Sequence, residues 1–305
     1  MKINSDFKRE KTIRKVTFIG ALVNIFLTVC KIIAGIYGRS AAMMADGVHS
    51  LSDLLSDFVV LIFTKISSKK NDRDHSYGHG KFETLATAIV SIILIVVGVR
   101  LMADAIERVS AFFRGEEIAK PGVIALVAAV VSIISKELLF RITKKVGDDV
   151  NSPVVVANAW HHRSDALSSI GSFAGIGGAM LLGPKWYFLD PAVCIIISIA
   201  IIVVAVRMAV PALEELLDKS LPDETVRKIE ELALGISGVI DIHELKTRRS
   251  GIDVLIEAHI LVDPDLTIVQ AHEISSNVEK VLESNFGYHT QINIHVEPDV
   301  KNDRP

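Results

Sequence analysis

Cysteine is almost absent from the sequence, since Cys30 and Cys194 are the only two among 305 residues. They fall in separate apolar segments, so we expect no disulfide framework and no Cys-x-x-Cys metal motif, and a small buried hydrophobe is the favoured interpretation of each. A large excess of one charge is also lacking, because the formal net charge is −3, so we expect no nucleic-acid partner. The charged start of the chain leads into a full-length apolar segment, so we expect no cleavable signal peptide.

Apolar residues, by contrast, are abundant. They make up 50% of the chain, and the mean hydropathy of +0.41 is too high for an ordinary soluble domain. A helix needs roughly 20 mostly apolar residues to cross a bilayer. Six segments in the first two-thirds of the chain meet this requirement: residues 12–37, 41–66, 82–107, 119–142, 153–182 and 187–210. We therefore predict an all-α transmembrane domain of six helices over residues 1–210.

Lysine and arginine are unevenly distributed over the loops that join these segments. Cytoplasmic loops of membrane proteins carry more of both residues than external loops do. One side of the predicted domain carries Lys2, Lys8, Arg9, Lys11, Arg14, Lys15, Lys65, Lys69, Lys70, Arg73, Lys81, Arg141, Lys144 and Lys145, and the other only Arg39, Arg108, Arg114, Lys120 and Lys185. We therefore expect both termini to lie in the cytoplasm.

The chain changes character near Pro211, where PALEELLDKSLPDE forms a polar junction. Beyond it, apolar residues recur at helical spacing over 223–236 and 267–286. Strand patterns occupy 239–248, 252–262 and 290–297, with a turn expected at Arg249-Ser250-Gly251. The order αββαβ predicts a compact α+β domain over residues 211–305.

Two segments of the predicted membrane domain repeat the pattern His-x-x-x-Asp. Residues 46–53 read DGVHSLSD and residues 158–165 read NAWHHRSD. Residues four apart share one face of a helix, so His49 is expected beside Asp53 and His161 beside Asp165. Asp46 and Asp57 extend the first stripe, and His161 is favoured over His162 only by its spacing from Asp165. Both pairs are expected near the middle of their spans, at similar depth.

Ionisable side chains are costly inside a bilayer, so such residues are candidates for a functional site. Two imidazoles and two carboxylates can supply four ligands to a tetrahedral ion, which suits Zn²⁺. The same groups bind protons, so they could exchange metal for H⁺. The alternative interpretation is that they form hydrogen bonds between helices and only stabilise packing.

Two further groups of polar residues are candidate metal ligands. Asp72, His75 and His79 have spacings of three and four in a loop where Gly78 and Gly80 permit close backbone approach; a solvated polar loop is the alternative. The second group is a dense set of histidines in the C-terminal domain, on two strands taken as central and on the last strand, where His295 and Glu297 share one face. Surface histidines on a structural domain are the alternative there, and His289 is expected to be exposed.

The sequence resembles the cation diffusion facilitators over nearly its whole length. The motifs that carry the resemblance are ADGVHSLSD, DHSYGHGKFE, NAWHHRSD, LLDKSLPD and the pattern of C-terminal histidines. The resemblance implies a dimeric metal/proton antiporter with six spans and a cytoplasmic ferredoxin-like domain. It places the transport site at His49, Asp53, His161 and Asp165. With histidine at the first of these positions, the sequence resembles the zinc-type members of the family.

The resemblance also implies roles outside the membrane. It suggests a second, weaker zinc site at Asp72, His75 and His79, and an ion pair of Lys81 with Asp218 that tethers the dimer. From the residues alone, Lys81 would be read as a positive-inside anchor. In the cytoplasmic domain the implied metal ligands are His243, His259, His272, His295 and Glu297. Two departures are that Glu297 replaces the more familiar aspartate and that one residue is inserted between His272 and His295.

We therefore expect a homodimeric exporter in the inner (plasma) membrane that moves divalent metal in exchange for protons. Zn²⁺ is the expected substrate, and Fe²⁺, Co²⁺, Cd²⁺ and Mn²⁺ are the alternatives. Zn²⁺ is expected both as substrate and as a regulatory ligand of the cytoplasmic domain. An intramembrane metal-dependent hydrolase is the alternative, but it needs an open coordination position and a general base, and the sequence has no His-Glu-x-x-His. A scaffold that only senses metal would not need the paired membrane motifs.

Overall fold

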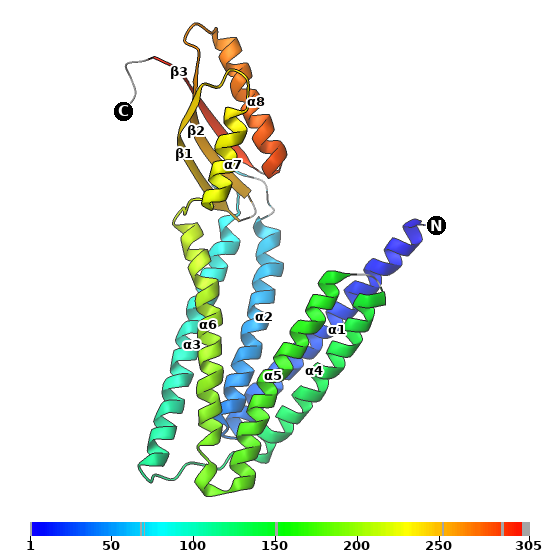
Figure 1. Cartoon of the computed structure of the whole chain (residues 1–305). Helices are drawn as coiled ribbons and strands as arrows, with labels where there is room; N and C mark the ends of the chain where they lie inside the picture. Colours follow the sequence, from blue (N-terminus) through cyan, green and yellow to red (C-terminus); the bar gives the residue numbers. More distant parts are fainter. Residues whose placement is uncertain are drawn as a thin grey trace. The chain divides into compact units, whose positions relative to one another are not determined.

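The computed structural model describes residues 2–67, 69, 71–149, 152–251, 253–287 and 290–300. Long helices make up the first two-thirds of the chain and a small sheet with two helices follows (Figure 1). The elements are α1 Lys2–Tyr37, α2 Ala41–Ser67, α3 Lys81–Phe113, α4 Val123–Asp149, α5 Pro153–Leu182, the 3₁₀ helix η1 Pro184–Trp186, α6 Leu189–Leu216, α7 Asp223–Leu234, β1 Asp241–Ser250, β2 Asp253–Val262, α8 Ile268–Phe286 and β3 Gln291–Pro298.

Each of the six predicted spans contains one long helix, although α4 begins at Val123 and α6 at Leu189, a few residues after the predicted starts at 119 and 187. Among the described residues, five stretches are long and apolar enough to cross a membrane, namely Arg14–Tyr37, Lys81–Phe113, Val123–Asp149, Val155–Leu182 and Pro184–Leu216. Helix α2 is of similar length but carries Asp46, Asp53 and Asp57. A helix satisfies its own backbone hydrogen bonds, which a span requires because hydrocarbon offers no water as a partner. The prediction of a helical membrane domain is confirmed.

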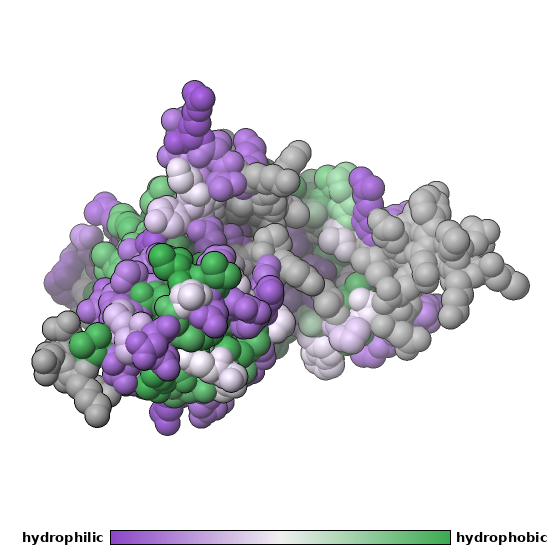
Figure 2. Space-filling model, turned by 90° about the horizontal axis from the view of Figure 1, so that it is seen from above, coloured by the Kyte–Doolittle hydropathy of each residue, from purple (hydrophilic) through white to green (hydrophobic). Residues whose placement is uncertain are grey.

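Large apolar side chains are exposed along these helices, among them Phe18, Phe26 and Val96, each more than 60% exposed. Such exposure is costly in water but suits a lipid-facing surface. The view from above instead shows mostly hydrophilic residues with smaller hydrophobic patches between them (Figure 2).

The chain forms two compact units, Met1–Phe58 with Val90–Arg207 and Val59–Ile89 with Met208–Pro305. In the first unit, α4 packs against α1 and α5. Small residues allow this close approach: Ala125 and Ala129 of α4 are fully buried, and a side chain at Gly147 would meet the backbone of Val156. Helices in membranes associate through such small residues because lipid gives apolar surfaces no hydrophobic drive to pair.

Asp190 of α6 satisfies the N-terminus of α2. Its carboxylate accepts the hydroxyl of Ser40 at 2.5 Å and the backbone N–H groups of Ala41 at 2.7 Å and Ala42 at 3.3 Å. The first N–H groups of a helix have no partner within the helix, and a negative charge there also interacts favourably with the helix dipole. A carboxylate distant in sequence therefore joins two spans of the first unit.

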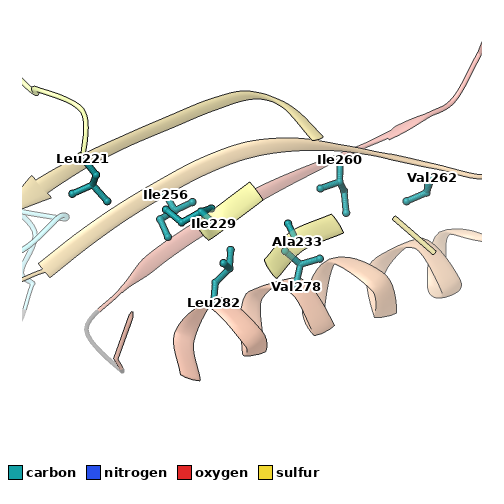
Figure 3. Close-up of a cluster of buried hydrophobic side chains, with 8 residues drawn as sticks. All are labelled: Leu221, Ile229, Ala233, Ile256, Ile260, Val262, Val278 and Leu282. Carbon is teal, nitrogen blue, oxygen red and sulfur yellow. The ribbon is translucent and has the colours of Figure 1, made fainter. Parts of the chain in front are cut away.

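The second unit contains the predicted α+β domain. Its three strands have the order β1-β2-β3, with β1 antiparallel and β3 parallel to β2. The parallel pair is possible because α8 carries the chain back across the sheet. Eight buried apolar side chains fill the space between the sheet and its helices (Figure 3): Leu221, Ile229, Ala233, Ile256, Ile260, Val262, Val278 and Leu282.

Some predicted boundaries are wrong in this domain and at its junction. Strand β2 alone is central and β1 lies at the edge, because the returning chain pairs with β2. Strand β1 continues to Ser250, which pairs with Asp253, so the turn is shorter than predicted and begins at Gly251 with φ +63°. Helix α6 also runs through Pro211 to Leu216, beyond the predicted end at 210.

Replacement of Leu282 by alanine tests the core of this domain. Because Leu282 is fully buried, the change should lower the free energy of unfolding of the domain by about 2–5 kcal/mol through lost burial and the cavity left behind. Hydrogen exchange of amides in residues 223–298 of the full-length protein measures the loss. The matched control Leu234→Ala removes a side chain that is 46% exposed, and equal effects of the two changes would contradict this description of the core.

Candidate metal centres

Three side chains from two membrane helices converge in the first unit. His49 and Asp53 lie one turn apart on α2, and Asp165 lies on α5; each offers a ligand atom within 4.8 Å of the other two. Asp165 is 5% exposed, and the Nδ1 atom of His49 is buried with no hydrogen-bond partner among the described residues. One imidazole and two carboxylates form a donor set suited to a divalent cation. The predicted proximity of the two aspartates is thus present, and their role as metal ligands stays a prediction.

The fourth predicted ligand, His161, lies beside this group without joining it. Its Nδ1 atom is 3.8 Å from Oδ1 of Asp165 and its side chain is 52% exposed. The neighbouring His162 is instead buried at 3% exposure, and neither of its ring nitrogens has a hydrogen-bond partner among the described residues. The i, i+4 spacing therefore distinguishes the histidine that faces Asp165 from the one packed into the helix bundle.

Two buried lysines in the same unit were not identified from the sequence. Lys136 of α4 donates to Oδ2 of Asp165 at 2.7 Å and to Oδ1 of Asn24 at 2.8 Å. Lys31 of α1 lies 3.0 Å from Oδ2 of Asp46. The signal was a lysine within a predicted membrane span, a position where a cation is rare and usually has an acidic partner.

Asp46 belongs to this second ion pair and not to the clustered ligands. Besides Lys31, it accepts hydrogen bonds from Ser168 at 2.7 Å and Ser169 at 2.9 Å, both on α5. Asp57, at the other end of the predicted stripe, is exposed. The acidic stripe on α2 therefore divides into a buried ion pair, a candidate metal ligand and an exposed residue.

In the second unit, the loop before α3 brings Asp72, His75 and His79 together, with ligand atoms within 4.8 Å of one another. The carboxylate oxygens of Asp72 lie 3.5 Å from Nδ1 of His75 and 3.3 Å from Nε2 of His79. The pKa of Asp72 lies below its usual value, chiefly because the backbone N–H of His75 donates to the carboxylate, with help from the N–H of Asp74 and the two imidazoles. The carboxylate therefore stays ionised, as a metal ligand must be.

This loop is held against the end of the sheet within the second unit. Gly80 packs on the carbonyl of Ser250, where any side chain would clash. The close approach of the two backbone segments therefore requires glycine at this position. Gly78 instead has φ +85° and open space around it. The amide of Gln291 donates to the carbonyl of Tyr77 at 3.3 Å.

The ion pair of Lys81 with Asp218 is present within one chain, at 2.6 Å. Arg248 also reaches the same carboxylate oxygen at 3.1 Å. Hydrogen bonds from Lys81 and Arg248 hold the pKa of Asp218 below its usual value. Asp218 thus remains ionised at neutral pH, and its contacts join the start of α3 to the segment just after α6 and to β1.

A row of histidines crosses the sheet in the second unit. His243, His259 and His295 are Cα partners on adjacent strands. Glu297 lies two residues beyond His295 and so on the same face, with its oxygens 3.2 Å from Nε2 of His243, 2.9 Å from Nδ1 of His259 and 3.4 Å from Nε2 of His295. Strand register therefore gathers four of the five predicted cytoplasmic ligands.

The fifth, His272, is not brought into this row. It is exposed on α8 and lines a hollow of about 370 Å³ with Ser275, Ile294 and Glu297. Its proposed part in metal binding therefore stays a prediction. His289 lies outside the described residues.

Comparison with known proteins places the chain in a family. The model of the cation efflux transmembrane domain matches residues 17–217, and that of the cytoplasmic domain of cation efflux proteins matches residues 221–299. The manganese efflux system protein MneP of Bacillus subtilis is 32% identical over 95% of this chain and 98% of its own. The magnetosome protein MamM of Magnetospirillum gryphiswaldense is 34% identical over 87% of this chain and 82% of its own.

Two further comparisons match only part of one chain, in the first case part of the relative and in the second case part of the present chain. Metal tolerance protein C1 of Arabidopsis thaliana is 33% identical over 93% of this chain, but the match spans only 62% of that longer protein. A solved structure of CzrB, described as a candidate zinc transporter, is 32% identical, covers 27% of this chain and 100% of its own, and has a TM-score of 0.26. The chain belongs to the cation efflux family, the cation diffusion facilitators, and is a multi-pass membrane protein of a family of metal transporters.

Proposed function

We propose that the protein exports divalent metal from the cytosol, with Zn²⁺ as its preferred substrate, in exchange for protons. The observation that carries the proposal is the convergence of His49, Asp53 and Asp165 from two membrane helices, with ligand atoms within 4.8 Å. Ionisable side chains are costly inside membrane helices, and less costly residues could pack the helices equally well. Three such groups in one place therefore indicate a function. Their chemistry fits a cation that crosses between the two faces of the membrane.

Proton exchange follows from the chemistry of the same ligands. Imidazole and carboxylate bind metal only when deprotonated, so metal and protons compete for them. In the proposed cycle, cytosolic metal binds while the site is open to the inside, with His161 as the fourth ligand after a small movement of its side chain. Protons that enter from outside then displace the metal outward. In this proposal the protein lies in the inner or plasma membrane, with both termini in the cytoplasm.

The preference for Zn²⁺ rests on the donor atoms. Imidazole suits zinc, whereas oxygen-rich sites suit harder ions such as Mn²⁺. The proposed set of His49, His161, Asp53 and Asp165 is half nitrogen. A relative is named for manganese efflux, so Mn²⁺ is an alternative substrate, together with Fe²⁺, Co²⁺ and Cd²⁺.

We also propose that the protein is a homodimer whose cytoplasmic domain senses zinc. The row of His243, His259 and His295 with Glu297 supports this proposal, because the four side chains lie together on one face of the sheet. Metal bound there would favour the transporting dimer. The loop group of Asp72, His75 and His79 is proposed as a second, weaker zinc site.

Loss of either acidic ligand should abolish transport. Asp53→Ala and Asp165→Asn each remove a negative charge from the site, and we expect zinc flux into proteoliposomes to fall to background. Asparagine is chosen at 165 because it removes the charge but can still accept a hydrogen bond from Lys136, whereas alanine would remove the acceptor as well.

The matched control is Asp148→Asn, which removes an exposed carboxylate that pairs with Lys144 on the same helix. This variant should transport zinc as the unmodified protein does, and all three variants should elute as folded dimers. Wild-type flux in Asp165→Asn would show that the transport site lies elsewhere.

Replacement of His49 by aspartate should change the selectivity. The change exchanges a nitrogen ligand for oxygen, which favours harder ions. We expect Zn²⁺ flux to fall relative to Mn²⁺ flux when both are measured in the same proteoliposomes. An unchanged ratio would mean that His49 does not touch the transported ion.

The sensor proposal is tested on residues 211–305 alone. A metal that binds the folded domain stabilises it by about 2.7 kcal/mol at a hundredfold excess over its dissociation constant, so Zn²⁺ should raise the melting temperature. The shift should vanish when His259 and His295 are both replaced by alanine. His272→Ala then shows whether that exposed residue contributes, and absence of any zinc-dependent shift in the unmodified domain would refute the sensor proposal while leaving the membrane site intact.

A further inference from the structure

Lys136 occupies one side of the Asp165 carboxylate. Its ammonium group is buried, with 3% of the residue exposed, and donates to Oδ2 of Asp165 at 2.7 Å. Asn24 of α1 holds the same ammonium group at 2.8 Å from its side-chain oxygen. The lysine is therefore fixed between two spans and aimed at one oxygen of a proposed metal ligand.

The two oxygens of Asp165 have different surroundings as a result. Oδ2 accepts the hydrogen bond from Lys136, whereas Oδ1 is the oxygen that lies 3.8 Å from Nδ1 of His161. Lys136 thus leaves Oδ1 as the oxygen through which a metal ion would bind while the lysine stays in place. Binding through both oxygens would bring the ion against the ammonium group, and two cations at one carboxylate repel each other strongly where water is scarce.

We propose that Lys136 is a positioning residue that restricts Asp165 to a single coordinating oxygen and so sets both the affinity and the metal preference of the site. The inference rests on the proposed transport site. A tetrahedral ion such as Zn²⁺ needs only one oxygen from each carboxylate. An ion that takes more oxygen ligands, such as Mn²⁺, loses the second oxygen of Asp165 to the lysine.

The charge of Lys136 also limits how tightly metal binds. In the metal-free protein, the ammonium group compensates one of the two carboxylates among the clustered ligands, which would otherwise repel each other in the membrane. When a divalent ion arrives, the same positive charge opposes it. A transport site must release its ion as well as bind it, and a cation beside one ligand weakens binding without removing a ligand.

The second buried lysine of this unit provides the comparison. Lys31 pairs with Asp46, which also accepts hydrogen bonds from Ser168 and Ser169. Asp46 is not one of the clustered ligands. Lys31 is therefore a buried ammonium group of similar exposure, in the same unit, whose partner does not belong to the proposed metal site.

The test compares metal binding by purified full-length variants in detergent, all carrying His259→Ala and His295→Ala. The membrane site is defined as the Zn²⁺ binding that Asp165→Asn abolishes. Lys136→Met should bind Zn²⁺ about tenfold more tightly or better, because it removes a nearby positive charge, and should gain Mn²⁺ affinity by a larger factor. X-ray absorption of the Mn²⁺ complex should show an additional oxygen ligand in this variant.

Two controls distinguish an effect of Lys136 on the metal site from an effect on the stability of the fold. Lys136→Arg keeps the charge and the hydrogen-bond donor, so it should keep the metal preference of the unmodified protein. The paired change Lys31→Met with Asp46→Asn removes the other buried ion pair and should leave Zn²⁺ and Mn²⁺ affinities unchanged. Because bound metal replaces the missing ammonium, Zn²⁺ should also raise the melting temperature of Lys136→Met by more than that of the unmodified protein.

The outcomes distinguish this inference from the proposed function. If Asp165→Asn binds zinc as the unmodified protein does, the site assignment itself is wrong. If Asp165→Asn loses binding but Lys136→Met keeps the unmodified affinities and metal ratio, only the role of Lys136 is refuted. A Lys136→Met protein that Zn²⁺ does not stabilise, while the Lys31 and Asp46 control folds, also refutes it, because the lysine would then be needed for folding alone.

Discussion

Compensation of carboxylates buried in apolar helices is the constraint on which the membrane part of the structure depends. Asp165 is paired with Lys136, Asp46 with Lys31, and Asp190 with the N-terminus of α2. Each of these partners comes from a different helix, so satisfying the charge also joins the helices. An unpaired buried charge would cost far more than packing between small residues can return.

The proposed transport site uses the same constraint. Asp53 and Asp165 are close together, and Lys136 is the cation that the structure places beside Asp165. A transported divalent ion would add two positive charges to this group of side chains each time it binds, and remove them each time it leaves. The resident lysine thereby links two properties that are otherwise separate, the stability of the empty site and its affinity for metal.

The second unit positions its histidine row by backbone register and its loop by close packing, a hydrogen bond and ion pairs. In the sheet, the pairing of β1, β2 and β3 aligns His243, His259 and His295. In the loop, Gly80 lies against Ser250, and Tyr77, Gln291, Lys81, Asp218 and Arg248 hold the segment near the sheet. The loop that carries Asp72, His75 and His79 is thus attached to the domain that carries the histidine row.

Local pattern in the sequence was sufficient to predict the helical spans, the αββαβ order and the pairing of His49 with Asp53, because hydrophobic period and i, i+4 spacing are properties of single elements. It could not predict that β2 alone is central, that the clustered ligands of the sheet do not include His272, or that Lys136 and Lys31 are the partners of Asp165 and Asp46. These features depend on contacts between elements far apart in the chain. Only the tertiary structure brings such elements together, and so only it decided which charge compensates which.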